Sequence, residues 1–364
     1  MNATRFVMVG GFLGAGKTTT ILALARRFHT QGQRVGIVTN DQASDLVDTR
    51  VMQAGGFDVS EIAGGCFCCR FDELKQATPE LDARQHPDVI LAEPVGSCTD
   101  LAATVLEPLR RYHGRFELGP LAVLVKPEHG RRILLNDQPL GVSREAAYIF
   151  EKQIEEADII AINKVDRLEA TERAELVQAL SERFPQAETM AISAKEGTGI
   201  DPFFAAIRDR VRVTQPFMDL DYDRYADGEA DLGWLNGSFE VTAPRPCALN
   251  DVAVSFLRHL ASALEGQGGE PAHIKVAVQS DDGVLAVANL VAGGEPVELT
   301  LAAEATTSRA SVTLNARAVI SPDQLDACTT QALRALAQDQ QLEWRVLSQQ
   351  SFQPGRPEPT HQFR

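Results

Sequence analysis

The chain has 364 residues, and 44% of them are hydrophobic. This is enough apolar material for about two domains with cores of their own, and too much for a disordered chain. The 35 basic and 50 acidic residues give a net charge of −15, which argues against a protein that coats nucleic acid or binds a membrane through a basic face. No apolar run approaches the roughly 20 residues of a membrane span, and no signal peptide is recognisable, so we expect a soluble cytoplasmic protein.

Short apolar segments alternate with helical patterns over the first part of the chain. Strands are predicted at residues 6–9, 34–39, 59–62, 88–92, 121–125, 158–162 and 188–192, with helices such as 19–28 between them. The strands are rich in Val and Ile and show little polar alternation, as is typical of strands buried on both faces. This order predicts a doubly wound, mostly parallel α/β sheet over residues 1–212.

The second part of the chain has a different pattern. Residues 213–232 are acidic and aromatic and are interpreted as a linker. Strands are then predicted at 237–242, 273–279, 284–290, 297–301, 311–319 and 344–352, with helices at 250–264 and 322–337. This order predicts a smaller α+β domain over residues 233–353, for which a ferredoxin-like fold is one candidate. The Pro-rich residues 354–364 are expected to form a flexible tail.

The first strand leads into a phosphate-binding loop. The segment from Gly11 to Thr18 matches G-x-x-x-x-G-K-[ST], between a predicted strand and a predicted helix. Its glycines let backbone N–H groups face a phosphate, Lys17 is expected to bridge the β- and γ-phosphates, and the Thr18 hydroxyl is expected to ligate Mg²⁺. The nucleotide-binding residues predicted here are Gly14, Ala15, Gly16, Lys17, Thr18 and Thr19.

A second motif favours guanine as the base. Asn163 and Lys164 follow a predicted strand and precede Asp166, at the sheet edge where α/β proteins bind ligands. The Asp166 carboxylate can accept from N1–H and the 2-amino group of guanine, whereas adenine offers neither donor. The loop after the next strand is expected to bind the guanine carbonyl through backbone N–H groups of Ser193, Ala194 and Lys195.

Acidic residues end two more strands. Glu93 begins an E-P-V-G sequence that ends at Gly96, and its carboxylate is expected to hold Mg²⁺ or to position the attacking water. Asp41 follows the second strand and is expected at the same sheet edge, with Asp45 and Asp48 as further candidates for switch residues. The predicted catalytic residues are Lys17, Glu93 and Asp41.

Three of the six cysteines lie within four residues, at Cys66, Cys68 and Cys69. Thiolates this close form a soft site for zinc, copper(I) or cobalt. A C-x-C-C sequence does not easily supply four tetrahedral ligands, so the fourth is expected from Glu61, a histidine or water. A redox pair and buried structural cysteines are the alternatives. Cys98, Cys247 and Cys328 are interpreted as ordinary small residues.

Together these motifs resemble the CobW-type GTPases, which are relatives of HypB and UreG. The resemblance covers the phosphate loop, the stretch from Glu61 to Cys69, the E-P-V-G sequence and the N-K-x-D sequence. It implies a protein that couples GTP binding and hydrolysis to delivery of zinc, cobalt or another metal to a client protein or cofactor enzyme. It also implies that the G-C-x-C-C motif holds the metal between two switch regions, and a homodimer is one candidate assembly.

The chain departs from this family at two places. Asn40-Asp41-Gln42-Ala43-Ser44 stands where the family usually has N-E-x-G-E, and Lys126 stands where an Asp is usual. The alternative function is a GTP-dependent activator of a client, such as a corrinoid-dependent enzyme, with structural cysteines and no metal transfer. A small-molecule kinase is a third candidate, which the N-K-x-D sequence disfavours.

Overall fold

The computed structural model describes residues 3–76, 86–112, 114, 116–135, 143–213, 216–291, 294 and 296–364. Its contacts divide the chain into two compact units. Unit 1 comprises the residues up to Gln42, Gly55–Gly228 and Arg356–Arg364, whereas unit 2 comprises Ala43–Ala54 and Glu229–Gly355. The chain therefore leaves unit 1 after Gln42 and returns to it at Gly55.

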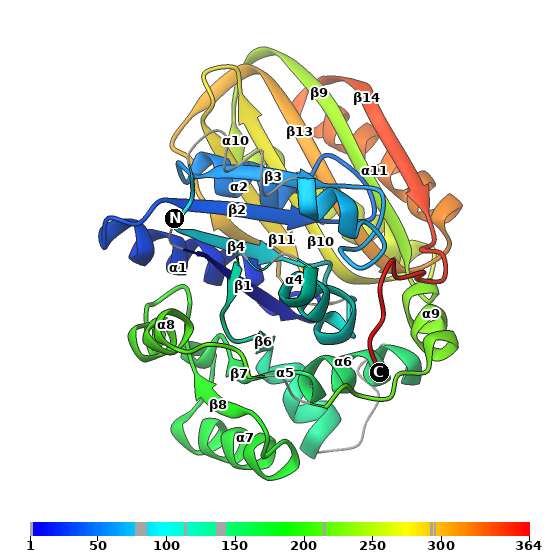
Figure 1. Cartoon of the computed structure of the whole chain (residues 1–364). Coiled ribbons are helices and arrows are strands. Elements are labelled where there is room, and N and C mark those ends of the chain that lie inside the picture. The colour runs from blue at the N-terminus through cyan, green and yellow to red at the C-terminus, as the bar shows by residue number, and fades with distance from the viewer. Residues whose placement is uncertain are drawn as a thin grey trace. The chain divides into compact units, whose positions relative to one another are not determined.

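Unit 1 is built on a parallel sheet in the order β3-β2-β4-β1-β6-β7-β8, with β5 paired to β1 (Figure 1). Each of these strand pairs is parallel, which confirms the doubly wound sheet predicted from the sequence. The strands are β1 (Thr4–Gly11), β2 (Val35–Asn40), β3 (Asp58–Ile62), β4 (Val89–Glu93), β5 (Phe116–Leu118), β6 (Ala122–Val125), β7 (Ile159–Ile162) and β8 (Glu188–Ala191). The sequence reasoning missed β5, which is short and half exposed.

Helices connect these strands. They are α1 (Lys17–Thr30), α4 (Glu107–Tyr112), α5 (Pro127–Gly130), α6 (Arg144–Glu155), α7 (Ala170–Arg183), α8 (Ile200–Asp209) and α9 (Tyr222–Ala230), with short turns η1 (Ala102–Leu106), η2 (Arg131–Leu135) and η3 (Val165–Arg167). Strands β4, β6 and β7 are buried along their whole length, and α1 buries Ile21, Leu24 and Phe28. Because the strands are parallel, their carboxyl ends gather the loops that follow β1, β2, β4 and β7 at one edge.

Unit 2 contains a six-stranded antiparallel sheet in the order β12-β11-β10-β13-β9-β14. Its elements are α2 (Val47–Ala54), β9 (Gly233–Ala248), α10 (Leu249–Gly266), β10 (Glu270–Ser280), β11 (Leu285–Leu290), β12 (Glu298–Leu301), β13 (Thr306–Val319), α11 (Pro322–Gln340) and β14 (Glu343–Phe352). The order β14-β9-β13-β10, with α10 and α11 as crossovers, is that of a ferredoxin-like fold, and the β11–β12 hairpin extends the sheet. Both helices pack against the sheet around one apolar core.

The segment Ala43–Ala54 packs within unit 2, which the sequence reasoning did not anticipate. Val47 of α2 lies in a small cluster with Ala277, Leu285 and Val287. Its backbone N–H also donates to Asn315 Oδ1 at 2.8 Å. Asp48, a candidate switch residue, pairs with Lys275 Nζ at 2.5 Å.

Two segments expected to lack regular structure make defined contacts. Helix α9 lies within the predicted linker 213–232, of which residues 214 and 215 fall outside the described part. Residues 356–364, predicted as a flexible tail, form hydrogen bonds inside unit 1. No helix in the described part of the chain is both long enough and apolar enough to cross a membrane.

Candidate functional site

The phosphate loop lies between β1 and α1, as its sequence predicts. Gly14 and Gly16 adopt left-handed conformations with φ of 76° and 92°. A Cβ atom at Gly16 would come within 2.4 Å of Asn163 Nδ2, so only glycine fits there. Lys17 is buried, and its Nζ donates to Gly11 O at 2.9 Å, whereas Thr19 is exposed at the start of α1. This loop presents the start of a helix and a lysine to an anion.

The residues expected to hold Mg²⁺ lie side by side. Glu93 ends β4 and is buried, and its Oε1 accepts a hydrogen bond from Thr18 Oγ1 at 3.1 Å. A hydroxyl and a carboxylate in contact form the kind of oxygen donor set that Mg²⁺ takes. Glu93 is in register with Thr39 of β2, so Asp41 lies just beyond the same edge of the sheet. The backbone N–H of Gln42 donates to Asp41 Oδ1 at 2.6 Å.

Asn163 joins the phosphate loop to the second predicted nucleotide loop. Its Nδ2 donates to Ala15 O at 2.8 Å, and its Oδ1 accepts from the Ala194 N–H at 3.0 Å. Both groups of Asn163 are therefore engaged in holding two loops together. Lys164 adopts a left-handed conformation, and Asp166 is exposed in the turn that follows.

The loop after β7 and the loop after β8 thus meet through Asn163. In the latter loop, Ser193 is buried, and its Oγ accepts from the Glu196 N–H at 3.1 Å. Lys195 is exposed. The arrangement leaves the Asp166 carboxylate available to a base, while Asn163 has a bridging role that the sequence motif did not reveal.

The three clustered cysteines bring their sulfur atoms together. The Sγ atoms of Cys66 and Cys68 are 2.7 Å apart, those of Cys66 and Cys69 are 3.2 Å apart, and those of Cys68 and Cys69 are 3.8 Å apart. Among the described residues, these sulfurs form a group of potential metal ligands that all lie within 4.8 Å of one another, and neither Glu61 nor Cys98 is a member of it. Glu61 as a ligand stays a prediction.

The thiols of this cluster differ in acidity. Hydrogen bonding with the Cys68 and Cys69 side chains holds the pKa of Cys66 well below its usual value. The same interaction with Cys66 raises the pKa of Cys68, and it raises the pKa of Cys69 to about 11. Cys66 is therefore the most acidic thiol of the cluster, and a metal that binds all three sulfurs would take them as thiolates.

Asn40 holds the cysteine loop in place, a role that its position at a strand end did not reveal. Its Nδ2 donates to Ile62 O at 2.9 Å and to Gly65 O at 2.7 Å. Its Oδ1 accepts from the Phe67 N–H at 2.9 Å. Because Asn40 ends β2 directly before Asp41, its buried side chain connects the carboxyl end of β2 to Gly65 and Phe67, the residues on either side of Cys66.

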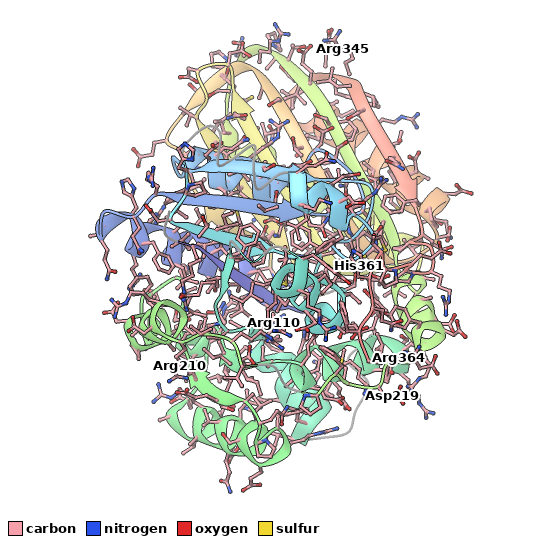
Figure 2. All side chains as sticks on the ribbon, viewed as in Figure 1. Arg110, Arg210, Asp219, Arg345, His361 and Arg364 are labelled. Atoms are coloured by element: carbon pink, nitrogen blue, oxygen red, sulfur yellow. The ribbon has the colours of Figure 1, made fainter. Side chains whose placement is uncertain are left out.

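Residues 356–364, which we call the strap, lead to the C-terminus (Figure 1) and hydrogen-bond the same loop. The Thr360 N–H donates to Cys68 O at 2.9 Å, and the backbone of Glu358 hydrogen-bonds Cys69. His361, labelled in Figure 2, packs edge-on against Phe71 with ring centroids 5.1 Å apart. The strap therefore lies over two of the three cysteines, and sequence patterns offer no signal for such a contact.

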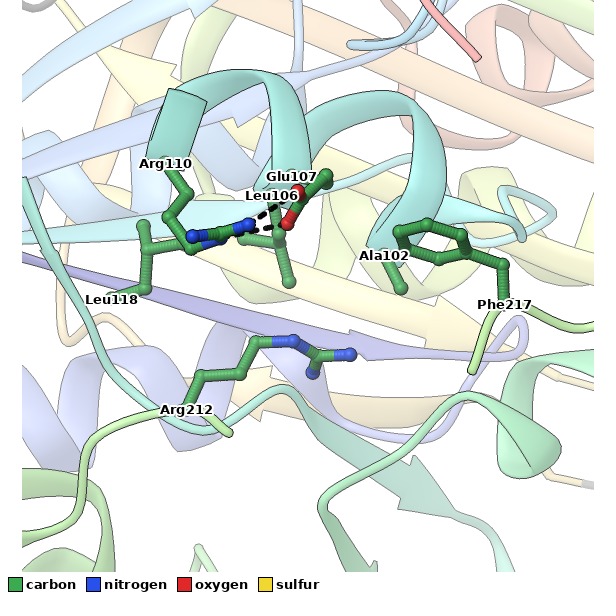
Figure 3. Close-up of a pocket in the computed structure, with 7 residues that line it drawn as sticks. All are labelled: Ala102, Leu106, Glu107, Arg110, Leu118, Arg212 and Phe217. Atoms are coloured by element: carbon green, nitrogen blue, oxygen red, sulfur yellow. Dashed lines mark hydrogen bonds and ion pairs between the residues drawn. The ribbon is translucent and has the colours of Figure 1, made fainter. Parts of the chain in front are cut away.

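A small pocket beside α4 is separate from this site (Figure 3). It is lined by Ala102, Leu106, Glu107, Arg110, Leu118, Arg212 and Phe217. Glu107 accepts hydrogen bonds from Arg110 at 2.5 and 2.8 Å, and Arg212 pairs with Asp158. None of the residues predicted to bind nucleotide or metal lines this pocket.

Comparison with known proteins agrees with the motifs. The model of the CobW/HypB/UreG nucleotide-binding domain matches residues 5–191, just over half of the chain. The chain belongs to the CobW/HypB/UreG family. Within this family, it is 27% identical over 219 residues to the zinc chaperone CobW of a Sinorhizobium species, an alignment that covers 52% of this chain and 58% of that one. It is 31% identical over 165 residues to the zinc chaperone YeiR of Escherichia coli, covering 45% of this chain and 47% of YeiR.

Solved structures similar to this CobW/HypB/UreG member match it at low sequence identity. HypB from Archaeoglobus fulgidus is 19% identical with a TM-score of 0.41, over 56% of this chain and 89% of that one. The Zn(II)-bound YjiA GTPase from E. coli is 16% identical with a TM-score of 0.38, over 92% of this chain and 99% of that one. The alignments to the curated relatives span about half of the relatives' own length.

Proposed function

We propose that this chain is a GTP-hydrolysing metal chaperone. It binds GTP at the phosphate loop, holds zinc, cobalt or another soft metal on Cys66, Cys68 and Cys69, and passes the metal to a client metalloprotein or cofactor enzyme. The observation that carries the proposal is the convergence of three sulfurs within 4.8 Å of one another, in a loop that Asn40 ties to the end of β2.

The proposed hydrolysis uses the strand ends of unit 1. Lys17 faces the β- and γ-phosphates, Thr18 and Glu93 are the residues that would hold Mg²⁺, and Asp41 is the switch carboxylate at the neighbouring strand end. When bound, Mg²⁺ neutralises the charge that develops on the phosphates. Gly96 supports this assignment, because a Cβ there would lie 3.1 Å from Lys17 Nζ, so the loop after β4 lies against the catalytic lysine.

Guanine is the proposed base because Asp166 is exposed at the carboxyl end of β7 while Asn163 holds the two flanking loops. A carboxylate there pairs with two N–H donors of guanine and with none of adenine. Asn163, Lys164, Asp166, Ser193, Ala194 and Lys195 are the residues of this base site in the proposal.

The metal is cargo in this proposal. Sulfur ligands favour zinc and other soft cations over Mg²⁺, so one chain can hold two kinds of metal ion at separate sites. All six cysteines are free thiols, which suits a reducing, cytoplasmic setting. GTP, GDP and the client are the proposed partners, with a homodimer as a candidate assembly that light scattering would test.

The test compares metal affinity between nucleotide states. The full chain, loaded with GDP or with a non-hydrolysable GTP analogue, is titrated with zinc against a chromophoric chelator. We expect the zinc dissociation constant to differ between the two states and zinc binding to be lost in Cys66→Ala. Cys328→Ala, which changes a buried cysteine of unit 2, is the matched control and should bind zinc normally.

Two outcomes would contradict the proposal. Equal zinc affinity in the GDP-bound and GTP-analogue-bound states would contradict the idea that the nucleotide controls metal transfer. Binding of GTP without binding of any transition metal would favour a GTP-dependent activator of a client enzyme instead.

A further inference from the structure

Cys98 lies against the metal cluster, although the sequence reasoning treated it as an ordinary small residue. It is 1% exposed and follows β4 in the loop that begins at Glu93. Its side chain hydrogen-bonds the side chain of Cys66, the sulfur that also contacts Cys68 and Cys69. We infer that Cys98 is the fourth ligand of the metal site and completes a tetrathiolate with Cys66, Cys68 and Cys69. This inference rests on the proposed metal-chaperone function and extends it.

The sulfur atoms of the C-x-C-C turn lie near the separations of a metal-bound set and need shifts of about 1 Å to reach them. Zinc–sulfur bonds of about 2.3 Å in a tetrahedron place sulfur atoms about 3.8 Å apart. Cys68 and Cys69 already have this separation, at 3.8 Å. Cys66 and Cys68, at 2.7 Å, have to separate by about 1 Å when a metal replaces the hydrogen bond between them. Cys98 is hydrogen-bonded to Cys66, but its sulfur lies more than 4.8 Å from at least one of Cys68 and Cys69. Its loop therefore has to move towards the cluster when a metal binds, and it would then supply the corner that the short C-x-C-C turn does not reach easily.

The surroundings support thiolates. The backbone of Cys69 hydrogen-bonds the Cys66 sulfur, and the backbone of Glu358 in the strap hydrogen-bonds the Cys69 sulfur. Such N–H donors offset part of the negative charge that four thiolates place on a zinc site, and they fix the direction of the ligands. Cys66 and Cys68 are each 2% exposed, so water has little access to the metal position from their side.

The position of Cys98 also connects the metal to the nucleotide. Gln153 Nε2 donates to Gly96 O at 3.0 Å and to Cys98 O at 2.9 Å, so one side chain holds both residues. A Cβ at Gly96 would lie 2.7 Å from Leu13 Cδ2 and 3.1 Å from Lys17 Nζ, so this loop packs closely against the phosphate loop. A shift of this loop when the γ-phosphate leaves would therefore move one ligand of four, while the other three stay in their own loop.

The test counts sulfur ligands. Zinc-loaded full-length protein is measured by X-ray absorption at the zinc edge, under reducing conditions, for the unaltered chain, Cys98→Ser and Cys98→Ala. We expect four sulfurs at about 2.3 Å in the unaltered chain and three sulfurs with one lighter atom in both variants. Zinc affinity should fall by at least about 10-fold, the cost usually seen for even an indirect partner of a metal ligand.

Controls separate a local effect from misfolding and from failure of the proposed function. Circular dichroism and GTP binding should be unchanged in Cys98→Ser, and Cys328→Ala should keep four sulfurs. Three sulfurs in the unaltered chain, or an unchanged count in Cys98→Ser, would overturn the role of Cys98 while leaving a metal chaperone with a three-cysteine site. Equal zinc affinity in both nucleotide states with four sulfurs present would instead overturn the nucleotide gating and leave the ligand assignment intact.

Discussion

The Asn40 side chain gives the sharpest prediction about the cysteine loop. It is 5% exposed and makes three hydrogen bonds, to Ile62 O, Gly65 O and the Phe67 N–H. Asn40→Ala removes all three and leaves the loop groups buried without this partner. At about 1 kcal/mol for each lost bond, the loop should be destabilised by about 3 kcal/mol against local opening.

Hydrogen exchange at the Phe67 amide measures this opening directly, because that N–H donates to Asn40 Oδ1. A loss of about 3 kcal/mol corresponds to exchange about two orders of magnitude faster. Tryptophan fluorescence would not serve, because both tryptophans, Trp234 and Trp344, lie in unit 2. Zinc affinity, measured by chelator competition, should fall in parallel, since the loop would have to be ordered when the metal binds.

A matched pair of variants strengthens the experiment. Asn40→Asp keeps the acceptor for Phe67 and loses both donated bonds, so its Phe67 exchange should lie between those of the unaltered chain and Asn40→Ala. Asn250→Ala removes an asparagine of unit 2 whose Oδ1 accepts a single bond from the Ala303 N–H, and it should leave Phe67 unchanged. Unaltered Phe67 exchange in Asn40→Ala would refute the claim that this residue orders the cysteine loop.

Three further changes test other parts of unit 1. In Gly96→Ala, the new Cβ would lie 2.7 Å from Leu13 Cδ2 and 3.1 Å from Lys17 Nζ, so GTP turnover should fall by about 100-fold; normal turnover would contradict the placement of Lys17. Burial raises the pKa of the Glu156 carboxyl to about 8, above its ordinary value of 4.5. Between these two pH values the folded chain keeps a proton that the unfolded chain releases. The free energy of unfolding therefore falls as the pH rises from 4.5 towards 8. Glu156→Gln should abolish this pH dependence, so the thermal unfolding midpoint of the variant should rise relative to that of the unaltered chain between pH 5 and pH 9. If the midpoints of the two proteins change with pH in the same way, the idea of a buried neutral carboxyl is contradicted. A variant that ends at Gly355 lacks the strap and the two hydrogen bonds from Thr360 to the cysteine loop. Its Cys69 thiol should react with a disulfide reagent at least about tenfold faster than that of the unaltered chain. An unchanged rate would show that the strap does not protect Cys69.

Much of unit 1 could be predicted because its signals are local. The Val- and Ile-rich segments and the helices between them are sufficient to predict a parallel sheet, and the structure confirms it. The order of elements after residue 233 predicted an α+β domain with a ferredoxin-like fold as one candidate, and the structure has this strand order with the β11–β12 hairpin added. Strand β5 was missed because its three residues, one intermediate, one exposed and one buried, are too few to carry a clear pattern.

The candidate site likewise contains features that local sequence motifs predict and features that only contacts between distant segments create. The phosphate loop, the N-K-x-D sequence and the cysteine cluster are contiguous motifs, so residue spacing alone is enough to predict a chemical role for each. Contacts between distant segments leave no such signal. Asn40 meets Gly65 across 25 positions, and Thr360 meets Cys68 across nearly 300. The assignment of Ala43–Ala54 to unit 2 also depends on packing against strands more than 200 residues away.

The sequence by itself determined the fold class and the family, and it predicted two kinds of metal site, because backbone periodicity and short motifs carry that information. Only the tertiary structure decided what surrounds the cysteines: Asn40 from a strand end, Cys98 from the loop after β4, and the strap. The physical reason is that hydrogen bonds and sulfur contacts act over a few ångströms in space, whatever the distance along the chain.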